Sequence, residues 1–268
     1  MPDPILLRKK IRETSPLIHN ITNVVVTNFT ANGLYALGAS PVMAYALEEV
    51  KDMAKIAGAL VLNIGTLSKQ TNEAMLAAGH SANEQGIPVF LDPVGAGATP
   101  FRTESAKTLL KELNISVIRG NAGEIANLSS SPVAMRGVDS TAELKDAKKT
   151  AESTALEWQT IVCMTGEQDI ITDGRSTFIV SNGTEMLTKI TGAGCLLTSV
   201  AAAFSSVEKN ALEAVTAACA FYGASAEAAA ERQSFSGPGH FQVHLLDMID
   251  QISDEDLQNR IQIHKEEE

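Results

Sequence analysis

Residues 60–93 read LVLNIGTLSKQTNEAMLAAGHSANEQGIPVFLDP, and this stretch has the pattern of a complete strand–helix–strand unit. The apolar runs Leu60–Asn63 and Val89–Leu91 have the length of buried strands, and Ser68–Gln85 between them has the apolar spacing of an amphipathic helix. Two strands joined through a crossover helix pair in parallel, and the helix covers one face of the sheet. The stretch therefore predicts an α/β fold built on a parallel sheet.

The same alternation of short apolar runs and longer helical patterns continues on both sides of this unit. We predict a three-layer α/β sandwich with a mainly parallel central sheet and helices on both of its faces. The other expected strands are Leu17–His19, Pro41–Met43, Val117–Arg119 and Ile161–Met164, and the other expected helices are Val24–Leu37, Glu48–Ala57, Thr103–Leu113 and Thr141–Leu156.

The pattern changes after Met164. Asp-Gly at 173–174 and Asn-Gly at 182–183 are strong hairpin signals, so we predict an antiparallel edge that completes the sheet. The strands expected there are Ile170–Thr172, Thr177–Ser181 and Met186–Thr188.

From Gly194 onward the chain has a helical pattern. It includes a long alanine-rich stretch from Ala211 to Arg232, and after Gly-Pro-Gly at 237–239 we expect a last pair of helices. We find no linker, fixed-period repeat or low-complexity tract, so residues 1–268 are predicted to form a single domain.

Composition and charge narrow the class of protein. The formal net charge of −11 argues against nucleic-acid binding, which needs a basic surface opposite the phosphates. Three dispersed cysteines do not make a disulfide framework and fit a reducing cytosol. No apolar run approaches membrane-spanning length and the N-terminus lacks a signal-peptide core, so we expect a cytoplasmic protein that does not enter membranes.

A glycine-rich segment, Thr191-Gly192-Ala193-Gly194-Cys195, precedes a strongly apolar helical run. Glycines let the backbone approach a ligand, and the unpaired amides and the dipole at a helix N-terminus favour an anion. The segment is a candidate phosphate site, although an ordinary glycine-rich start of a helix has the same pattern. A Walker P-loop is excluded because its Gly-x-x-x-x-Gly-Lys-Ser/Thr motif is absent.

Polar residues follow several of the expected strands, where open parallel sheets bind their ligands. Asn121 and Glu124 are three residues apart and could hold Mg²⁺ through water, while Arg119 could pair with a phosphate. The alternative is an asparagine helix cap with Glu124 stabilising the first helical turn. Asp92, at the end of an expected strand, could position a metal or a phosphate, or it could be a turn aspartate that bonds its own backbone. Thr165 could contact a nucleotide or make a turn.

Five motifs follow one another along the chain: ITNVVVTNFTANG at 21–33, GASPVM at 38–43, LDPVGAG at 91–97, RGNAGE at 119–124 and TGAGC at 191–195. In this order, they resemble the motifs of the hydroxyethylthiazole kinase family of thiamine biosynthesis, within the ribokinase-like kinases. The match extends from residue 17 to about residue 240, and its first and third motifs are long and unusual.

The resemblance implies that MgATP phosphorylates the primary alcohol of 4-methyl-5-(2-hydroxyethyl)thiazole. It also implies a homotrimer whose active sites lie between subunits. In the implied site, Met43, Asn23 and Gly192 border the thiazole, and Arg119, Thr165 and Asn121 contact ATP. Asp92 and Glu124 would organise magnesium, and Gly192, Ala193, Gly194 and Cys195 would form the catalytic turn.

Cys195 departs from the usual pattern of the ribokinase-like kinases, which place an aspartate after the Gly-Ala-Gly turn to accept the alcohol's proton. A helix N-terminus lowers the pKa of a thiol, whereas a nearby triphosphate opposes that shift. Phosphoryl transfer through a loose transition state needs little early proton removal. We therefore hypothesise that Cys195 assists turnover but is dispensable.

Two other functions stay open. Dehydratases that repair hydrated nicotinamide nucleotides share this architecture and a glycine-rich anion turn, but the segment Ile21–Gly33 argues against them. A nucleotide-binding regulator without turnover is less attractive because Asp92 and Glu124 are retained.

Overall fold

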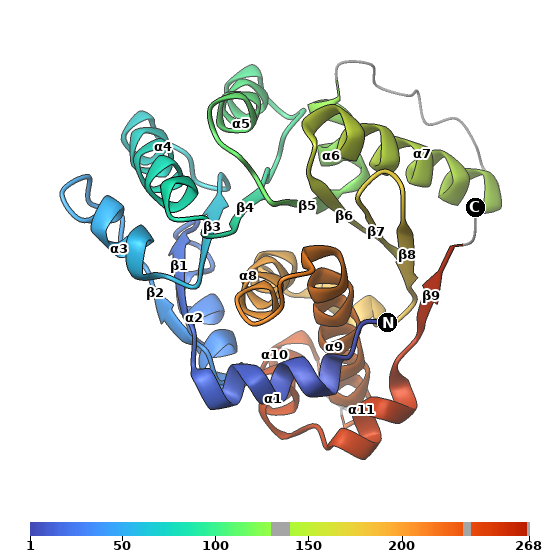
Figure 1. Cartoon of the computed structure of the whole chain (residues 1–268). Helices are drawn as coiled ribbons and strands as arrows, with labels where there is room; N and C mark the ends of the chain where they lie inside the picture. The colour runs from blue at the N-terminus through green and yellow to red at the C-terminus, as the bar shows by residue number, and fades with distance from the viewer. Residues whose placement is uncertain (130–139, 233–236, 267–268) are drawn as a thin grey trace.

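A computed structural model describes residues 1–129, 140–232 and 237–266 of the chain, and within these ranges nine strands form one sheet (Figure 1). The strand order is β2-β1-β3-β4-β5-β6-β7-β8-β9. Strands β1 to β6 pair in parallel, and β7, β8 and β9 are antiparallel to their neighbours. The strands are β1 (Leu17–Ile21), β2 (Ser40–Val42), β3 (Ala59–Asn63), β4 (Val89–Asp92), β5 (Val117–Asn121), β6 (Ile161–Thr165), β7 (Asp169–Thr172), β8 (Thr177–Val180) and β9 (Ile263–Lys265).

Helices cover both faces of the sheet, which confirms the predicted three-layer α/β architecture with an antiparallel edge (Figure 1). One face carries α3 (Val50–Ile56), α4 (Lys69–Glu84), α5 (Pro100–Glu112), α6 (Ala122–Leu128) and α7 (Ser140–Trp158). The other face carries α1 (Pro4–Thr14), α2 (Thr27–Leu37), α8 (Ala193–Ser205), α9 (Ala211–Glu231), α10 (Pro238–Gln251) and α11 (Asp254–Arg260).

Alternating strand residues explain why the chain forms two cores. In β3 all five side chains are buried, with Val61 facing the core under α8 and α9 and Leu60 and Leu62 facing the core under α3 and α4. A strand buried on both faces reads as a continuous apolar run, as expected for the middle of a parallel sheet. This is why the stretch 60–93 predicts the fold so directly.

The antiparallel edge differs in part from the prediction. The Asp-Gly signal at 173–174 does join the antiparallel strands β7 and β8, with Gly174 at φ +85°. The strand expected at Met186–Thr188 is wrong, because these residues lie in a 3-10 helix, η1 (Glu185–Lys189). The Thr184 side chain caps that helix by accepting from the Met186 amide.

The partner of β8 is instead β9, near the C-terminus, where we expected only helices. Asn-Gly at 182–183 does not form a hairpin, because Asn182 is committed to other contacts. Its Nδ2 donates to Glu227 Oε1 and to the Arg260 carbonyl, and its Oδ1 accepts from the Gln262 amide. These bonds lead the C-terminal segment alongside β8. Helix α1 was not predicted either. Within the described parts of the chain, no helix combines the length and hydropathy needed to cross a membrane.

Candidate active site

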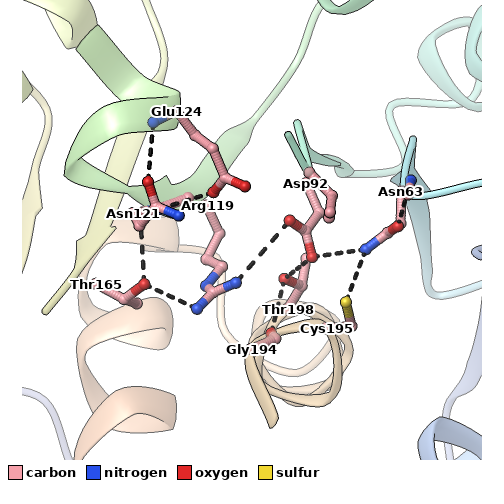
Figure 2. A network of polar contacts seen from close by, with 12 residues as sticks. Asn63, Asp92, Arg119, Asn121, Glu124, Thr165, Gly194, Cys195 and Thr198 are labelled. Atoms are coloured by element: carbon pink, nitrogen blue, oxygen red, sulfur yellow. Dashed lines mark hydrogen bonds and ion pairs between the residues drawn. The ribbon is translucent and has the colours of Figure 1, made fainter. Parts of the chain in front are cut away.

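The ends of the parallel strands bring distant polar residues together at one edge of the sheet. In register, Asn63 at the end of β3 stands beside Asp92 at the end of β4, and Asn121 at the end of β5 stands beside Thr165 at the end of β6. Helix α8 begins beside these strand ends, so its first turn meets them (Figure 2). Of the residues predicted from the sequence, Asp92, Arg119, Thr165, Gly194 and Cys195 lie together at this edge.

The first turn of α8 is shaped to receive an anion. Gly192 is the N-cap at φ +87°, a left-handed conformation that favours glycine, and a Cβ on it would come within 2.7 Å of Val26 Cγ1. Hydrogen bonding within the helix starts where the Leu196 amide donates to the Gly192 carbonyl. The three preceding amides therefore belong to the unpaired first turn, where a negative ligand is stabilised.

The backbone of this turn also lies close to a cation. A Cβ on Gly194 would be 2.4 Å from Arg119 Nη1, so only glycine leaves room for the guanidinium. Behind the turn, the Tyr222 hydroxyl donates to the Ala193 carbonyl at 2.9 Å. The positive charge of Arg119 beside the N-terminus of α8 thus supports the prediction that this segment binds an anion.

Asp92 is fully buried at the end of β4. Asn63 Nδ2 and Thr198 Oγ1 donate to its Oδ2 at 2.8 and 2.9 Å, and Arg119 Nη1 lies 3.9 Å from its Oδ1. No described residue donates a hydrogen bond to Oδ1. Burial raises the pKa of Asp92 above its ordinary value, and the Arg119 charge opposes that shift. One carboxylate oxygen is therefore held by two donors, and the other is buried without a hydrogen-bond donor among the described residues.

Arg119 links Asp92 to a large cavity. Its Nη2 donates to Thr165 Oγ1 at 2.8 Å, and both residues line a cavity of about 730 Å³. The start of α8, the turn after β6, the segment from β8 into η1 and part of α9 form the other walls. This volume suits a small organic ligand, and the anion-binding turn is part of its wall.

Asn121 and Glu124 form a reciprocal capping box at the start of α6. The Glu124 amide donates to Asn121 Oδ1 and the Asn121 amide donates to Glu124 Oε2, each at 2.9 Å. Glu124 Oε1 also accepts from the Gly95 amide at 2.8 Å. The interpretation of Asn121 as a helix cap is confirmed. The ATP contact of Asn121 and the metal contact of Glu124 stay predictions. The Glu124 charge still acts on the site, since it adds to the raised pKa of Asp92.

Cys195 sits between two carboxamides. Asn63 Nδ2 is 3.2 Å and Asn23 Nδ2 is 3.5 Å from its Sγ. Burial, followed by the charge of Asp92, raises the pKa of the thiol to about 11. The thiol is therefore mostly protonated at neutral pH.

The predicted thiazole-binding residues are only partly joined to this cluster. Asn23 follows β1 and is tied in through Asn63 Oδ1 and the Cys195 thiol. Met43 directly follows the edge strand β2 and is half-buried at the same edge of the sheet. Its contact with the thiazole stays a prediction.

Four residues of the site were missing from the predicted set. Asn63 lies at a strand end that the sequence flags, and Thr198 follows Gly194 by four residues, which places both on one face of α8. Asp169 and Tyr222 line the cavity from the antiparallel strand β7 and from α9. No local pattern pointed to these two, because they reach the site only through the tertiary fold.

The donor set suits magnesium rather than a metal held by protein ligands alone. In the residues that the structure describes, no group of three or more histidine, cysteine, aspartate or glutamate side chains is arranged to hold an ion. Mg²⁺ retains several waters and binds through one or two carboxylates together with substrate phosphates. The buried Asp92 Oδ1, which lacks a hydrogen-bond donor among the described residues, fits that requirement.

Comparison with known proteins agrees with this geometry. The model of the family described as the hydroxyethylthiazole kinase family matches residues 8–255. A solved hydroxyethylthiazole kinase protein from Pyrococcus horikoshii OT3 is 42% identical over 98% of this chain and 99% of that chain, with a TM-score of 0.90.

More distant structures share the fold. A ribokinase-like superfamily protein from Enterococcus faecalis V583 is 11% identical over 92% of this chain and 94% of that one, with a TM-score of 0.65. An ADP/ATP-dependent NAD(P)H-hydrate dehydratase from Bacillus subtilis is 17% identical over 92% and 96%, with a TM-score of 0.59. At these identities the likeness concerns the ribokinase-like architecture alone. The match over nearly the whole chain and the 42% identity decide the family: this chain belongs to the hydroxyethylthiazole kinase family.

Proposed function

We propose that this chain transfers the terminal phosphoryl group of ATP to the primary hydroxyl of 4-methyl-5-(2-hydroxyethyl)thiazole, in the salvage branch of thiamine biosynthesis. Family membership supports the reaction. The observation that carries it in the structure is the first turn of α8, whose amides meet the Arg119–Asp92 pair beside a large cavity. Amides and a guanidinium directed at one point stabilise charge that develops on a transferring phosphoryl group.

ATP is the phosphoryl donor, and we assign it to the cavity. Arg119, Thr165 and Gly194 all line that cavity, and there the phosphates would meet the α8 amides. Asn121 is the N-cap of α6 and lies beside Thr165 in the pairing of β5 with β6. It would contact ATP from the end of β5. Because Arg119 already bonds Thr165 and faces Asp92, it is pre-oriented for the phosphates and needs little reorganisation.

Mg²⁺ is the metal proposed for this site, and Asp92 and Glu124 would hold it. It would supply neutralisation of phosphate charge when bound. Asp92 contributes the carboxylate oxygen that no described residue caps, while Asn63 and Thr198 hold the other oxygen in place. Glu124 is bonded to backbone amides through both oxygens, so it would act mainly through its charge and its second lone pairs.

The acceptor alcohol is assigned to a pocket that Asn23, Met43 and Gly192 would border. Cys195 lies beside Asn23, and its raised pKa keeps the thiol mostly protonated at physiological pH, so it does not act as a strong base before transfer begins. Alignment and charge stabilisation then account for most of the rate. The proton leaves the alcohol late, as the new oxygen–phosphorus bond forms and the bond to ADP breaks, and it passes to an oxygen of the transferred phosphoryl group.

A homotrimer with active sites between subunits is part of the proposal. Val24 and Val25 directly follow Asn23 and are 72% and 64% exposed in the isolated chain, and Tyr35 on α2 is 66% exposed. Exposed apolar side chains next to a substrate pocket are what a subunit interface would cover. Light scattering at assay concentration is expected to give three times the chain mass, and a monomer would contradict shared sites.

The enzymatic test is a coupled assay of ADP release with a panel of small alcohols. We expect magnesium-dependent release with hydroxyethylthiazole and much less with hydroxymethylpyrimidine, pyridoxal or ribose. Absence of thiazole-dependent release in the presence of magnesium would overturn the proposal. An assay for dehydration of hydrated NADH separates the dehydratase alternative. Residues 1–268 are proposed to act as one kinase domain in the cytoplasm.

A further inference from the structure

Asn63 occupies the junction of the site, and all four hydrogen-bonding positions of its carboxamide are used. Its Nδ2 donates to Asp92 Oδ2 at 2.8 Å and lies 3.2 Å from Cys195 Sγ. Its Oδ1 accepts from Asn23 Nδ2 at 2.9 Å and from the Gly65 amide at 3.0 Å. Figure 2 shows the amide between the carboxylate on one side and the thiol on the other.

The orientation of this carboxamide is fixed by the backbone. The Gly65 N–H can only donate, so the atom of Asn63 that faces it must be the oxygen. The NH₂ group is thereby directed to Asp92 and Cys195, and a flipped amide would set two donors against each other at Gly65. Asn63 is therefore a donor to both groups by necessity.

The orientation of the Asn23 carboxamide is fixed in the same way. Since Asn63 presents its oxygen, Asn23 must present Nδ2, and that NH₂ also lies 3.5 Å from Cys195 Sγ. The sulfur is accordingly flanked by two amide donors from β3 and from the segment after β1. Its rotamer is set by strands of the central sheet and not only by α8.

Asn63 also joins two groups that sit on different elements. Asp92 ends β4 and Cys195 lies in the first turn of α8, and the one NH₂ group bonds both of them. Thr198 adds a second contact between α8 and Asp92 Oδ2. Small displacements of reacting groups cost large factors in rate, so such a tie matters most for the transfer step.

We propose that Asn63 is a positioning residue that holds the Asp92 carboxylate and the Cys195 thiol in fixed relation through its doubly donating carboxamide. The proposal rests on the proposed kinase function for its kinetic consequence. Asn63 touches neither reacting group directly in this scheme. It acts through Asp92 and Cys195, so its loss is expected in kcat and not in the binding of either substrate.

The test is Asn63→Asp, which keeps the oxygen that accepts from Gly65 and Asn23 and replaces the NH₂ by an oxygen that can donate to Asp92 only when it is protonated. With the wild-type kinase active, we expect kcat to fall by about 10- to 100-fold while KM for ATP and for the thiazole changes less than about threefold. A kcat within twofold of wild type would overturn the proposal. So would a loss confined to KM.

A second readout uses no magnesium, nucleotide or turnover. Alkylation of Cys195 by iodoacetamide, followed at one pH by mass spectrometry of its peptide, is expected to slow several-fold in Asn63→Asp. A carboxylate oxygen would then replace the N–H beside the sulfur and disfavour the reactive thiolate. An unchanged alkylation rate overturns the positioning of the thiol. If the wild-type enzyme shows no thiazole kinase activity, the proposed function fails and this readout alone decides for or against Asn63.

Asn20→Asp is the matched control, because Asn20 is an equally buried asparagine on the adjacent strand β1. Its carboxamide bonds the Ile18 carbonyl and the Ser199 hydroxyl and does not contact the thiol. We expect a similar drop in Tm without the loss of kcat. Equal losses of kcat in both variants would show a general effect of burying a carboxyl and overturn the proposal. If Asn63→Asp does not fold, Asn63→Ser removes the carboxamide without adding a charge and takes the same measurements.

Discussion

The guanidinium of Arg119 spans from the Asp92 carboxylate to the Thr165 hydroxyl, with Nη1 3.9 Å from Oδ1 and Nη2 2.8 Å from Oγ1. Asp92 is fully buried, and Arg119 is the cation that offsets its charge. The pair therefore contributes both to the fold and to the site, and the two contributions can be separated by mutation.

Arg119→Met is expected to destabilise the fold by about 3 kcal/mol at pH 8, because a buried carboxylate is left without its cation. Burial already raises the pKa of Asp92, and loss of Arg119 raises it further. A carboxyl whose pKa is raised in the folded state makes the fold less stable as pH rises. The stability difference between Arg119→Met and wild type should therefore shrink on going from pH 8 to pH 5. Urea unfolding of variant and wild type at both pH values measures this.

The double variant Arg119→Met with Asp92→Asn is the control for that prediction. It removes both charges, so most of the stability should return while kinase activity stays low. A deficit that is the same at pH 5 and pH 8 would contradict the account of Arg119 as the partner of a buried charge.

Gly194→Ala tests the contact between α8 and Arg119. The added Cβ would lie 2.4 Å from Nη1, and the end of the arginine side chain must move to make room. We expect kcat/KM for ATP to fall by about 100-fold. The Tm should stay within a few degrees of wild type, since alanine favours a helix over glycine.

Gly239→Ala is the matched glycine for that experiment. It lies in α10, and a Cβ there meets nothing within 4 Å. Its kinetics should equal wild type. Normal use of ATP by Gly194→Ala would mean that the guanidinium position is unimportant.

The parallel part of the fold could be predicted because each strand is buried on both faces and reads as an apolar run. Strands β3 and β4 and helix α4 fall within a few residues of the expected ranges for this reason. The edge strand β9 could not be predicted locally. Its pairing with β8 joins residues more than 80 positions apart, and the intervening Asn182 side chain, not a hairpin turn, directs it.

In the site, too, some residues could be predicted from local sequence and others could not. Asp92, Arg119 and the glycine turn are visible in the sequence because each combines a strand end or helix start with an unusual residue. The pKa of Cys195 could not be predicted, since it depends on burial and on Asp92, more than 100 residues away. The link from Asn63 to Cys195 spans 132 residues and exists only in the folded chain.

Cys195→Ser should reduce kcat by less than about tenfold, because a thiol with a pKa of about 11 provides little base at neutral pH. Coupled ADP release at saturating substrates measures the change. Alkylation of wild-type Cys195 should be slow at pH 8 and rise about tenfold for each pH unit up to about 11. A loss of 1,000-fold or more in both Cys195→Ser and Cys195→Ala, with folding intact, would identify the thiol as an essential base.

Asp169 on β7 lines the cavity, and its Oδ1 accepts from the Gly166 amide at 3.1 Å. Burial raises its pKa from 3.8 to about 6. The folded chain therefore binds this proton more tightly than the unfolded chain does, and stability is lost as pH rises from about 4 through 6. Asp169→Asn keeps the acceptor for Gly166 and removes the charge, so it should raise the free energy of unfolding at pH 8 by at most about 3 kcal/mol.

The gain from Asp169→Asn should disappear below pH 4, where the wild-type carboxyl is protonated in both the folded and unfolded states. Urea unfolding across pH 3.5 to 8 follows this difference. Asp173→Asn changes an exposed aspartate in the turn of the same hairpin and should keep the wild-type dependence on pH. A difference between Asp169→Asn and wild type that is constant with pH would mean that Asp169 is not strained by its charge. Its place in the cavity wall would then be explained by the Gly166 contact alone.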